Sequence, residues 1–499
     1  MTAAIPPSAP VAVIGTGTMG AGIAQVAAVA GHPVLLYDAV EGAAARAADG
    51  IRARVARLVE KGRLAEPAEL RLQVAGDLAD LASAQCVIEA VAEDLAVKQA
   101  LFAELEKIVG AECVLATNTS SLSPAAIAAG LSHPGRLVGM HFFNPAPLMR
   151  LVEVVSGLAT DPAVAAAVTG LAERWGKQVV QAAATPGFIV NRVARPFYAE
   201  ALRLAEEQAA PPVTIDAVLT QAGGFRMGPF ALMDLVGQDV NEAVTRSVWT
   251  AFGYDSRFAP SQLQRAMVEA GWLGRKSGRG WYHYDDGAPD PAPDTVPAHP
   301  APAWVATTGA PALRAILDRS GMPAGEEPGG AAHPAGTAAL PGGALLVRCD
   351  GRPASVLAAQ WRRPVVTVDR TLDDATAAGI AIAASEPAAV AEAAGLLQAA
   401  GLTVYLLDDT PGLVVTRTVA MLVNGAIDAR HRGVASAADI DTAMQLGTNY
   451  PLGPLAWGQR WGAGTVLTVL DNLQAAYGED RYRPSALLRR IAASGGSLT

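Results

Sequence analysis

Cysteine is nearly absent from this 499-residue sequence, which has only Cys86, Cys113 and Cys349, each far from the others. No two of them have the short spacing that is typical of zinc ligands or redox motifs. A disulfide framework needs closely matched cysteine pairs and an oxidising compartment. We therefore expect neither a metal site nor disulfide bonds, and the cysteine content fits a reducing compartment such as the cytoplasm.

Positive charge is also scarce, with 38 lysines and arginines against 47 acidic residues and a net charge of −9. This balance argues against a nucleic-acid partner and against a basic membrane-surface protein. Only five of the basic residues are lysines, and these are Lys61, Lys98, Lys107, Lys177 and Lys276. A phosphate-rich ligand would therefore depend on these few lysines, on arginines or on backbone N–H groups.

Long unbroken apolar runs are missing as well. The first ten residues have neither the positive charge nor the apolar stretch of a signal peptide. The longest uncharged stretch, residues 11–37, is interrupted by several glycines and by Pro33. It predicts a buried strand, turn and helix instead of a membrane span, so we expect no association with a membrane.

The order of apolar segments predicts an α/β protein followed by helical domains. In the first 190 residues, short apolar runs alternate with amphipathic stretches. This alternation is typical of a doubly wound, mostly parallel sheet of the Rossmann type. Helical periodicity replaces it from Gly187 onward, and Ala, Pro and Gly then dominate a linker-like segment. We expect a Rossmann domain, a helical domain, a linker, a degenerate Rossmann-like remnant and a second helical domain, at residues 1–186, 187–285, 286–340, 341–408 and 409–499.

An internal repeat supports the second helical domain. Thr185-Pro186-Gly187-Phe188 recurs as Thr410-Pro411-Gly412-Leu413, an offset of 225 residues. The pairs Ile215-Asp216 and Gly228-Pro229 recur at the same offset. Ungapped matches over such a length predict that the all-α domain is duplicated.

A glycine-rich segment follows the first predicted strand and consists of Gly15, Thr16, Gly17, Thr18, Met19 and Gly20. Glycines at this spacing allow a tight turn, the close approach of a pyrophosphate and the packing of helix on strand. Asp38 ends the next strand, where a carboxylate accepts hydrogen bonds from a ribose and repels a 2′-phosphate. The pattern predicts NAD binding, and the alternative is a glycine turn beside a solvated aspartate.

His141 and Glu153 form a second candidate site. His141 ends an apolar strand, and Glu153 lies within the next one. A buried carboxylate needs a hydrogen-bonding partner. A histidine beside it could act as a general base, and the carboxylate would then orient its ring. The alternative is a core histidine bonded to the backbone, with Glu153 on an exposed strand face.

Three further polar positions have equally ordinary alternatives. Ser120, in Asn118–Ser121, could contact a ligand or cap the following helix. Asn191 could bind a substrate carbonyl or be a satisfied core amide. Lys276 lies in a basic, glycine-rich turn that could be a solvated loop.

Six longer stretches carry a resemblance to a known family: GTGTMGAGIAQVAA, EAVAEDLAVKQ, NTSSLS, HFFNPAPLMRLVEV, TPGFIVNR and GRKSGRGWY. With them, residues 10–285 closely resemble the L-3-hydroxyacyl-CoA dehydrogenase family, and the repeat does so more loosely. The two-copy layout resembles the branch of 3-hydroxybutyryl-CoA and 3-hydroxyadipyl-CoA dehydrogenases. The resemblance implies NAD as cofactor and duplicated helical domains of the 6-phosphogluconate-dehydrogenase-like type.

The resemblance also implies roles for individual residues. His141 would be the general base, Glu153 its orienting partner, and Ser120 and Asn191 hydrogen-bonding partners of the substrate. The implied cofactor contacts beyond the glycine loop are Asp38, Glu93, Lys98, Asn144 and Lys276. The implied CoA contacts are Lys61, Lys98 and Ser120.

The implied reaction is the oxidation of an L-3-hydroxyacyl-CoA in fatty acid or phenylacetate catabolism. The helical domains imply a homodimer or an intrachain pseudo-dimer. Thr416 stands in place of Asn191 in the second copy, which predicts one active site per chain. Two alternatives stay open, namely a dehydrogenase of a free 3-hydroxy acid and an NAD-binding protein without catalytic activity.

Overall fold

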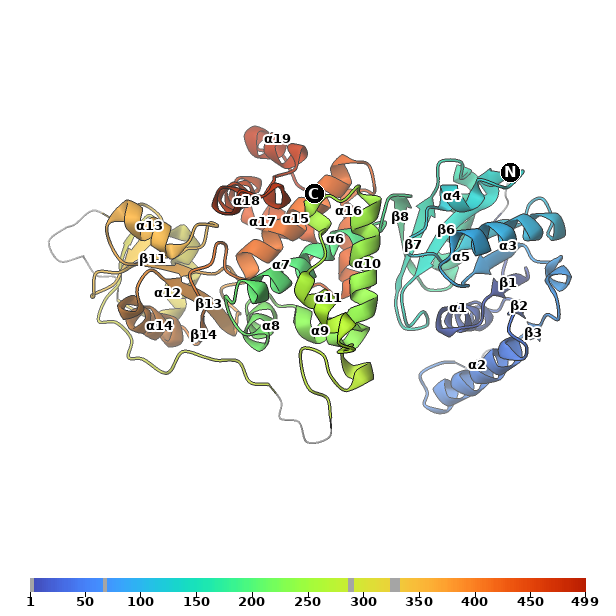
Figure 1. Ribbon diagram of the computed structural model, residues 1–499, viewed down its shortest axis with the longest axis horizontal. Helices are drawn as coiled ribbons and strands as arrows, with labels where there is room; N and C mark the ends of the chain where they lie inside the picture. Colours follow the sequence, from blue (N-terminus) through green and yellow to red (C-terminus); the bar gives the residue numbers. More distant parts are fainter. Residues whose placement is uncertain (1–3, 66–69, 286–290, 324–332) are drawn as a thin grey trace. The chain divides into compact units, whose positions relative to one another are not determined.

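The computed structural model describes residues 4–65, 70–285, 291–323 and 333–499. The chain folds into two compact units (Figure 1). The first contains residues 1–192 and 429–448, and the second contains residues 193–428 and 449–499. The second helical copy is thus shared between the units, since one of its helices belongs to the first. In the parts of the chain that the structure describes, no helix is long and apolar enough to cross a membrane.

An eight-stranded sheet forms the centre of the first unit. Its strands are β1 (Val11–Ile14), β2 (Val34–Tyr37), β3 (Leu72–Val74), β4 (Cys86–Glu89), β5 (Val114–Thr117), β6 (Leu137–Phe142), β7 (Leu151–Ser156) and β8 (Gln178–Ala183). Their order in the sheet is β3-β2-β1-β4-β5-β6-β7-β8. All neighbours are parallel except β6 and β7, which are antiparallel. The predicted doubly wound Rossmann-type sheet is confirmed, and its order reverses between β1 and β4, where such sheets bind ligands.

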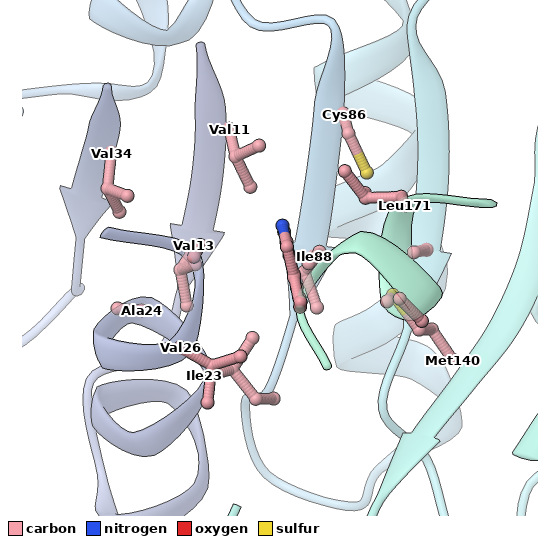
Figure 2. Packing of buried hydrophobic residues seen from close by; sticks show 14 of the residues in the cluster. Val11, Val13, Ile23, Ala24, Val26, Val34, Cys86, Ile88, Met140 and Leu171 are labelled. Carbon is pink, nitrogen blue, oxygen red and sulfur yellow. The ribbon is translucent and has the colours of Figure 1, made fainter. Parts of the chain in front are cut away.

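Apolar side chains alternate between the two faces of this sheet. Val11 and Val13 of β1 pack against one group of helices, whereas Ala12 and Ile14 pack against another. The first group consists of α1 (Thr18–Val29), α2 (Ala43–Glu60) and α5 (Pro162–Arg174). The second consists of α3 (Leu95–Ile108) and α4 (Pro124–Ala128). Figure 2 shows the first face, where Ile23 of α1 and Leu171 of α5 meet the strand side chains.

The helical duplication is confirmed helix by helix. The first copy contains α6 (Val190–Val193), α7 (Arg195–Glu206), α8 (Pro212–Gln221), α9 (Pro229–Val236), α10 (Gln238–Ala251) and α11 (Gln262–Glu269). The second contains α15 (Val415–His431), α16 (Ala437–Thr448), α17 (Pro454–Trp461), α18 (Ala463–Tyr477) and α19 (Ala486–Ser494). Each copy begins with a glycine at positive φ, Gly187 at 73° and Gly412 at 78°. The following residues, Phe188 and Leu413, share that unusual conformation with φ of 46° and 49°.

A six-stranded sheet in the second unit corrects the expected linker. Its strands are β9 (Ala306–Thr308), β10 (Thr337–Ala339), β11 (Leu345–Arg348), β12 (Val365–Val368), β13 (Gly379–Ala384) and β14 (Thr403–Leu406). Residues 286–340 therefore contribute β9, β10 and the helix α12 (Arg314–Ser320) to a packed domain. The expectation of a linker failed because strands of three small residues carry no periodicity. Residues 286–290 and 324–332 of that segment lie outside the described residues.

The repeat extends from the helices into this sheet. The strands β11-β12-β13-β14 have the order and directions of β5-β6-β7-β8, since the outer pairs are parallel and the central pair is antiparallel. The helix α13 (Ala354–Trp361) covers one face, and α12 and α14 (Val390–Ala399) cover the other. The second copy thus keeps the C-terminal half of the first sheet.

Arg417 joins the two helical copies within the second unit. This side chain is fully buried and lies on α15 of the second copy. Its Nε donates to Glu200 Oε2 at 3.0 Å, and its Nη1 donates to Glu207 Oε2 at 3.2 Å, both at the first copy. The hydroxyl of Tyr482 accepts from Nη2 at 2.7 Å and donates to Glu200 at 2.9 Å. The charges compensate one another, which is the condition for burying them.

We expect Arg417→Met to lower the free energy of unfolding by about 3–5 kcal/mol, because it leaves Glu200 charged and buried without its partner. Arg489→Met is a matched control, since the Arg489–Asp471 pair is exposed and should contribute less than about 1 kcal/mol. Urea unfolding followed by circular dichroism measures both. Equal effects of the two substitutions would contradict this role of Arg417.

Candidate active site

The loop between β1 and α1 has the shape of a dinucleotide-binding loop. Gly15 has φ of +84°, and a Cβ there would lie 2.6 Å from the carbonyl oxygen of Ala90. A Cβ on Gly20 would lie 1.8 Å from the carbonyl oxygen of Gly15, whereas a Cβ on Gly17 would meet nothing within 4 Å. Two glycines are therefore required by packing, and the third faces open space. No side chain caps α1, so its N-terminal N–H groups are available to a pyrophosphate.

Asp38 is held at the end of β2 by three hydrogen bonds. Its Oδ2 accepts from the backbone N and the hydroxyl of Thr16 at 2.6 and 2.8 Å, and its Oδ1 accepts from Val40 N at 2.9 Å. Partial burial raises the pKa of Asp38, but the hydrogen bonds and nearby Arg46 outweigh it and lower this pKa below its usual range. A fixed carboxylate beside the glycine loop fits the ribose of NAD.

His141 and Glu153 face each other across the antiparallel pair β6–β7. The distance between His141 Nδ1 and Glu153 Oε2 is 2.6 Å. Glu153 is fully buried, and its other oxygen accepts from Ile189 N and Val190 N at 3.1 and 3.0 Å. Among the described residues, His141 Nε2 has no hydrogen-bond partner. Glu153 thus fixes the ring through Nδ1 and leaves Nε2 for a ligand, which is the arrangement of an oriented general base.

Glu93 organises the loop that contains Ser120. Its Oε1 accepts from Thr119 Oγ1 at 2.6 Å and from Ser120 N at 2.9 Å. Although burial raises the pKa of Glu93, these bonds and Lys98 outweigh it and lower the pKa. The hydroxyl of Ser120 and the amide of Asn191, both half-buried, have no hydrogen-bond partner among the described residues. Both groups can therefore bind a ligand.

Two predicted site residues form ion pairs with carboxylates. Lys98 is only 1% exposed, and its Nζ lies 2.5 Å from Glu89 Oε1 and 3.3 Å from Glu93 Oε2. A buried ammonium that is paired with two carboxylates gives no support to the expected contact between Lys98 and CoA, which stays a prediction. Lys276 belongs to the second unit, where its Nζ lies 2.5 Å from Asp239 Oδ1.

A basic pocket of about 770 Å³ lies beside the glycine loop, between α1, α2 and residues 144–148. Gly17, Thr18 and Asn144 line it together with a group of cations, namely Arg46, Arg54, Arg57, Lys61 and Arg63. Sequence reasoning identified only Lys61. The spacing of 46, 54, 57 and 61 places four cations on one face of a helix, a signal that could have revealed the others.

The second sheet has an aspartate at the position of the histidine. The register of β12 and β13 brings Asp369 opposite Ala381, as His141 lies opposite Glu153. Asp369 Oδ2 accepts from Val414 N and Val415 N at 3.0 and 2.7 Å. These residues correspond in the repeat to Ile189 and Val190, the donors to Glu153. One buried carboxylate therefore replaces the histidine–glutamate pair. This position of the second sheet has no histidine that could act as a general base.

Three family models match the chain. The NAD binding domain of 3-hydroxyacyl-CoA dehydrogenase matches residues 10–185, and the C-terminal domain of the same family matches residues 187–284 and again 412–497. The third, described as the 3-hydroxybutyryl-CoA dehydrogenase reduced Rossmann-fold domain, matches residues 346–411. Together the matches cover residues 10–185, 187–284 and 346–497.

Two individual relatives are similar over nearly the whole chain, and a third over a little more than half of it. A 3-hydroxyadipyl-CoA dehydrogenase from Escherichia coli K12 is 48% identical over 489 residues, which cover 97% of each chain. A crystal structure named as 3-hydroxybutyryl-CoA dehydrogenase from Escherichia coli K12 has a TM-score of 0.89 and 46% identity, covering 98% of this chain and 99% of the other. The (S)-3-hydroxybutyryl-CoA dehydrogenase of Ralstonia eutropha covers 56% of this chain and 99% of its own, with 38% identity and a TM-score of 0.54.

The shorter relative matches only a little more than half of this chain, whereas the longer ones match nearly all of it. The glycine loop and Asp38 fit the cofactor that the first family model names. Because the likeness extends over the full length at nearly half identity, the chain belongs to the 3-hydroxyacyl-CoA dehydrogenase family and is an NAD-dependent dehydrogenase.

Proposed function

We propose that this protein oxidises the 3-hydroxyl group of a short or medium L-3-hydroxyacyl-CoA to a ketone, with 3-hydroxyadipyl-CoA or 3-hydroxybutyryl-CoA as substrate. The observation that carries the proposal is the buried His141–Glu153 pair, whose Nε2 is left for the substrate. NAD bound at the glycine loop supplies the acceptor of the hydride. The names of the similar Escherichia coli proteins support these two substrates.

In this proposal His141 Nε2 takes the proton of the substrate hydroxyl. Glu153 holds the Nδ1–H bond and stabilises the positive charge that the ring acquires. Since Glu153 is already fixed by two backbone N–H groups, little reorganisation is needed when the proton moves. The hydroxyl of Ser120 and the amide of Asn191 are proposed to hold the reacting oxygen or the thioester.

The basic pocket favours a CoA thioester over a free 3-hydroxy acid. CoA carries three phosphate groups, and a free hydroxy acid carries none. We propose that Arg54, Arg57 and Lys61 bind these phosphates, while the glycine loop binds the pyrophosphate of NAD. A free acid would leave this group of cations without a ligand.

We further propose that the enzyme acts in the cytoplasm and that its two helical copies form an intrachain pseudo-dimer. The three cysteines are buried and unpaired, which supports a reducing compartment. The Arg417 network, which joins the copies within the second unit, supports the pseudo-dimer. A homodimer of such chains is the alternative. The aspartate at position 369 supports a single active site per chain.

We expect His141→Ala to lower kcat by about 10²- to 10⁴-fold, because it removes the proton acceptor. Glu153→Gln should cause a comparable loss, since a neutral amide cannot stabilise the protonated ring. NADH binding, measured by fluorescence titration, should change little in both variants. His133→Ala, at an exposed histidine of the same unit, is the matched control. Near-normal turnover of His141→Ala would contradict the assignment.

We expect kcat/KM to be at least about 100-fold higher with NAD than with NADP, because the Asp38 carboxylate repels the 2′-phosphate. The lowered pKa keeps this carboxylate charged at every pH above its usual value of about 3.9. The preference should therefore be constant from about pH 9 to pH 7, weaken as the 2′-phosphate gains a proton near its second pKa of about 6, and vanish only in stronger acid. Asp38→Ser should reduce the preference, whereas Asp49→Asn, at an exposed site on α2, should not. Equal use of both cofactors by the wild type would refute this role.

We expect Lys61→Ala and Arg57→Ala each to raise KM for 3-hydroxybutyryl-CoA by about 3- to 10-fold, because each removes one cation from the phosphate site. The same variants should be unaffected with the N-acetylcysteamine thioester of the same acid, which has no phosphates. Lys107→Ala, at an exposed lysine of α3, is the control. Equal losses with both thioesters would argue for a structural role of the two cations.

A further inference from the structure

The helical part of the second unit contains a cavity that the proposed function does not use. Its volume is about 600 Å³. It is lined by α7, by Thr245 of α10, by residues 259–264 at the start of α11, and by Arg481. All these residues belong to one unit.

In the part of the chain that the structure describes, Arg195 is a buried cation without a carboxylate partner. Its side chain lines the cavity, and the residue is only 6% exposed. Its Nη1 donates to the neutral hydroxyl of Thr245 at 3.1 Å, and its Cζ lies 4.9 Å from the ring centroid of Tyr198. Its Nε is buried and has no hydrogen-bond partner among the described residues. Burying a charge without a counter-ion costs free energy, which an anion in the cavity would offset.

Two other arginines of this unit, one buried and one partly buried, are neutralised by carboxylates. Arg417 binds Glu200 and Glu207, and Arg203 binds both oxygens of Glu479 at 3.0 Å. Arg481, the second cation of the cavity, has no hydrogen bond from its buried Nε and lies 3.7 Å from the already occupied Glu479. The cavity therefore gathers two incompletely neutralised guanidinium groups.

The N-terminus of α11 supplies further donors to the same cavity. Ser261 caps this helix by accepting from Gln264 N at 3.1 Å. Gln262 and Leu263, the first two residues of α11, line the cavity, and their backbone N–H groups have no partner in the described chain. The first N–H groups of a helix and its positive dipole end bind anions.

The acidic group at this cavity sets the charge of its ligand. Glu206 lines the cavity and accepts from the Ser261 hydroxyl. Two arginines and one glutamate give a net charge of about +1, which matches a monoanion better than a phosphate dianion. A planar guanidinium also pairs with a carboxylate through two parallel hydrogen bonds.

We propose that this cavity is a carboxylate-binding site, in which Arg195 and the N–H groups at the start of α11 hold one carboxylate. The ligand is a free dicarboxylate that binds within the second unit, and adipate is the probe that represents it.

The test compares the full-length wild type with Arg195→Gln, and with Arg265→Gln as the control at an exposed arginine of α11. Adipate binding is measured by calorimetry. We expect Arg195→Gln to weaken adipate binding by about 10- to 100-fold, the effect of one lost charge-assisted hydrogen-bond pair. Arg265→Gln should change nothing.

Glu206→Gln, which removes the negative charge of the cavity, should tighten adipate binding and tests the site even if Arg195→Gln does not fold. A wild type that binds no adipate, or an Arg195→Gln variant that binds adipate as tightly as the wild type, would overturn the proposal.

Discussion

The candidate site depends on the burial of one charge, the carboxylate of Glu153. A fully buried carboxylate is tolerated only when both oxygens are engaged. One oxygen of Glu153 binds His141 of the neighbouring strand, and the other accepts two N–H groups at the start of α6. These contacts tie β6, β7 and the first turn of the helical domain to one side chain. The tautomer and orientation of the histidine then follow from the requirement to satisfy that charge.

The second half of the chain meets the same requirement without a histidine. Asp369 reaches the helix N-terminus directly and accepts from Val414 N, Val415 N and Thr416 N. Burial raises the pKa of this aspartate, which its hydrogen-bond donors oppose. The constraint that survives in both halves is therefore the capping of a buried helix end by a carboxylate. The duplicated fold preserves this structural interaction. Among the described residues, the histidine that could act as the base is present only in the first half.

The duplication also gives the apolar faces of the two helical copies a partner within the same chain. Apolar and aromatic side chains of the two copies meet within the second unit, where Phe225 packs against Tyr450 and Trp457 at ring distances of 5.0 and 5.5 Å. Arg417 adds a compensated charge to the same contact between copies. An apolar helical face that lacks a partner needs a second surface, and here the same chain supplies it. The helix α16 of the second copy packs instead on β7 and β8 of the first unit.

The sequence by itself determined the features that neighbouring residues encode. The glycine loop, the strand before it and Asp38 are local, and the offset of 225 residues placed the helical repeat in its true register. The pairing of His141 with Glu153 was predictable as a hypothesis, because two consecutive strands carried them. Tertiary structure alone decided which lysine is buried, so Lys98 is an internal counter-ion of Glu89 and Lys61 lines the basic pocket. It also decided that Ala-rich residues 306–308 and 337–339 are strands and that Asp369 takes the place of a histidine. These outcomes depend on strand register and on long-range partners, which the order of residues along the chain does not specify.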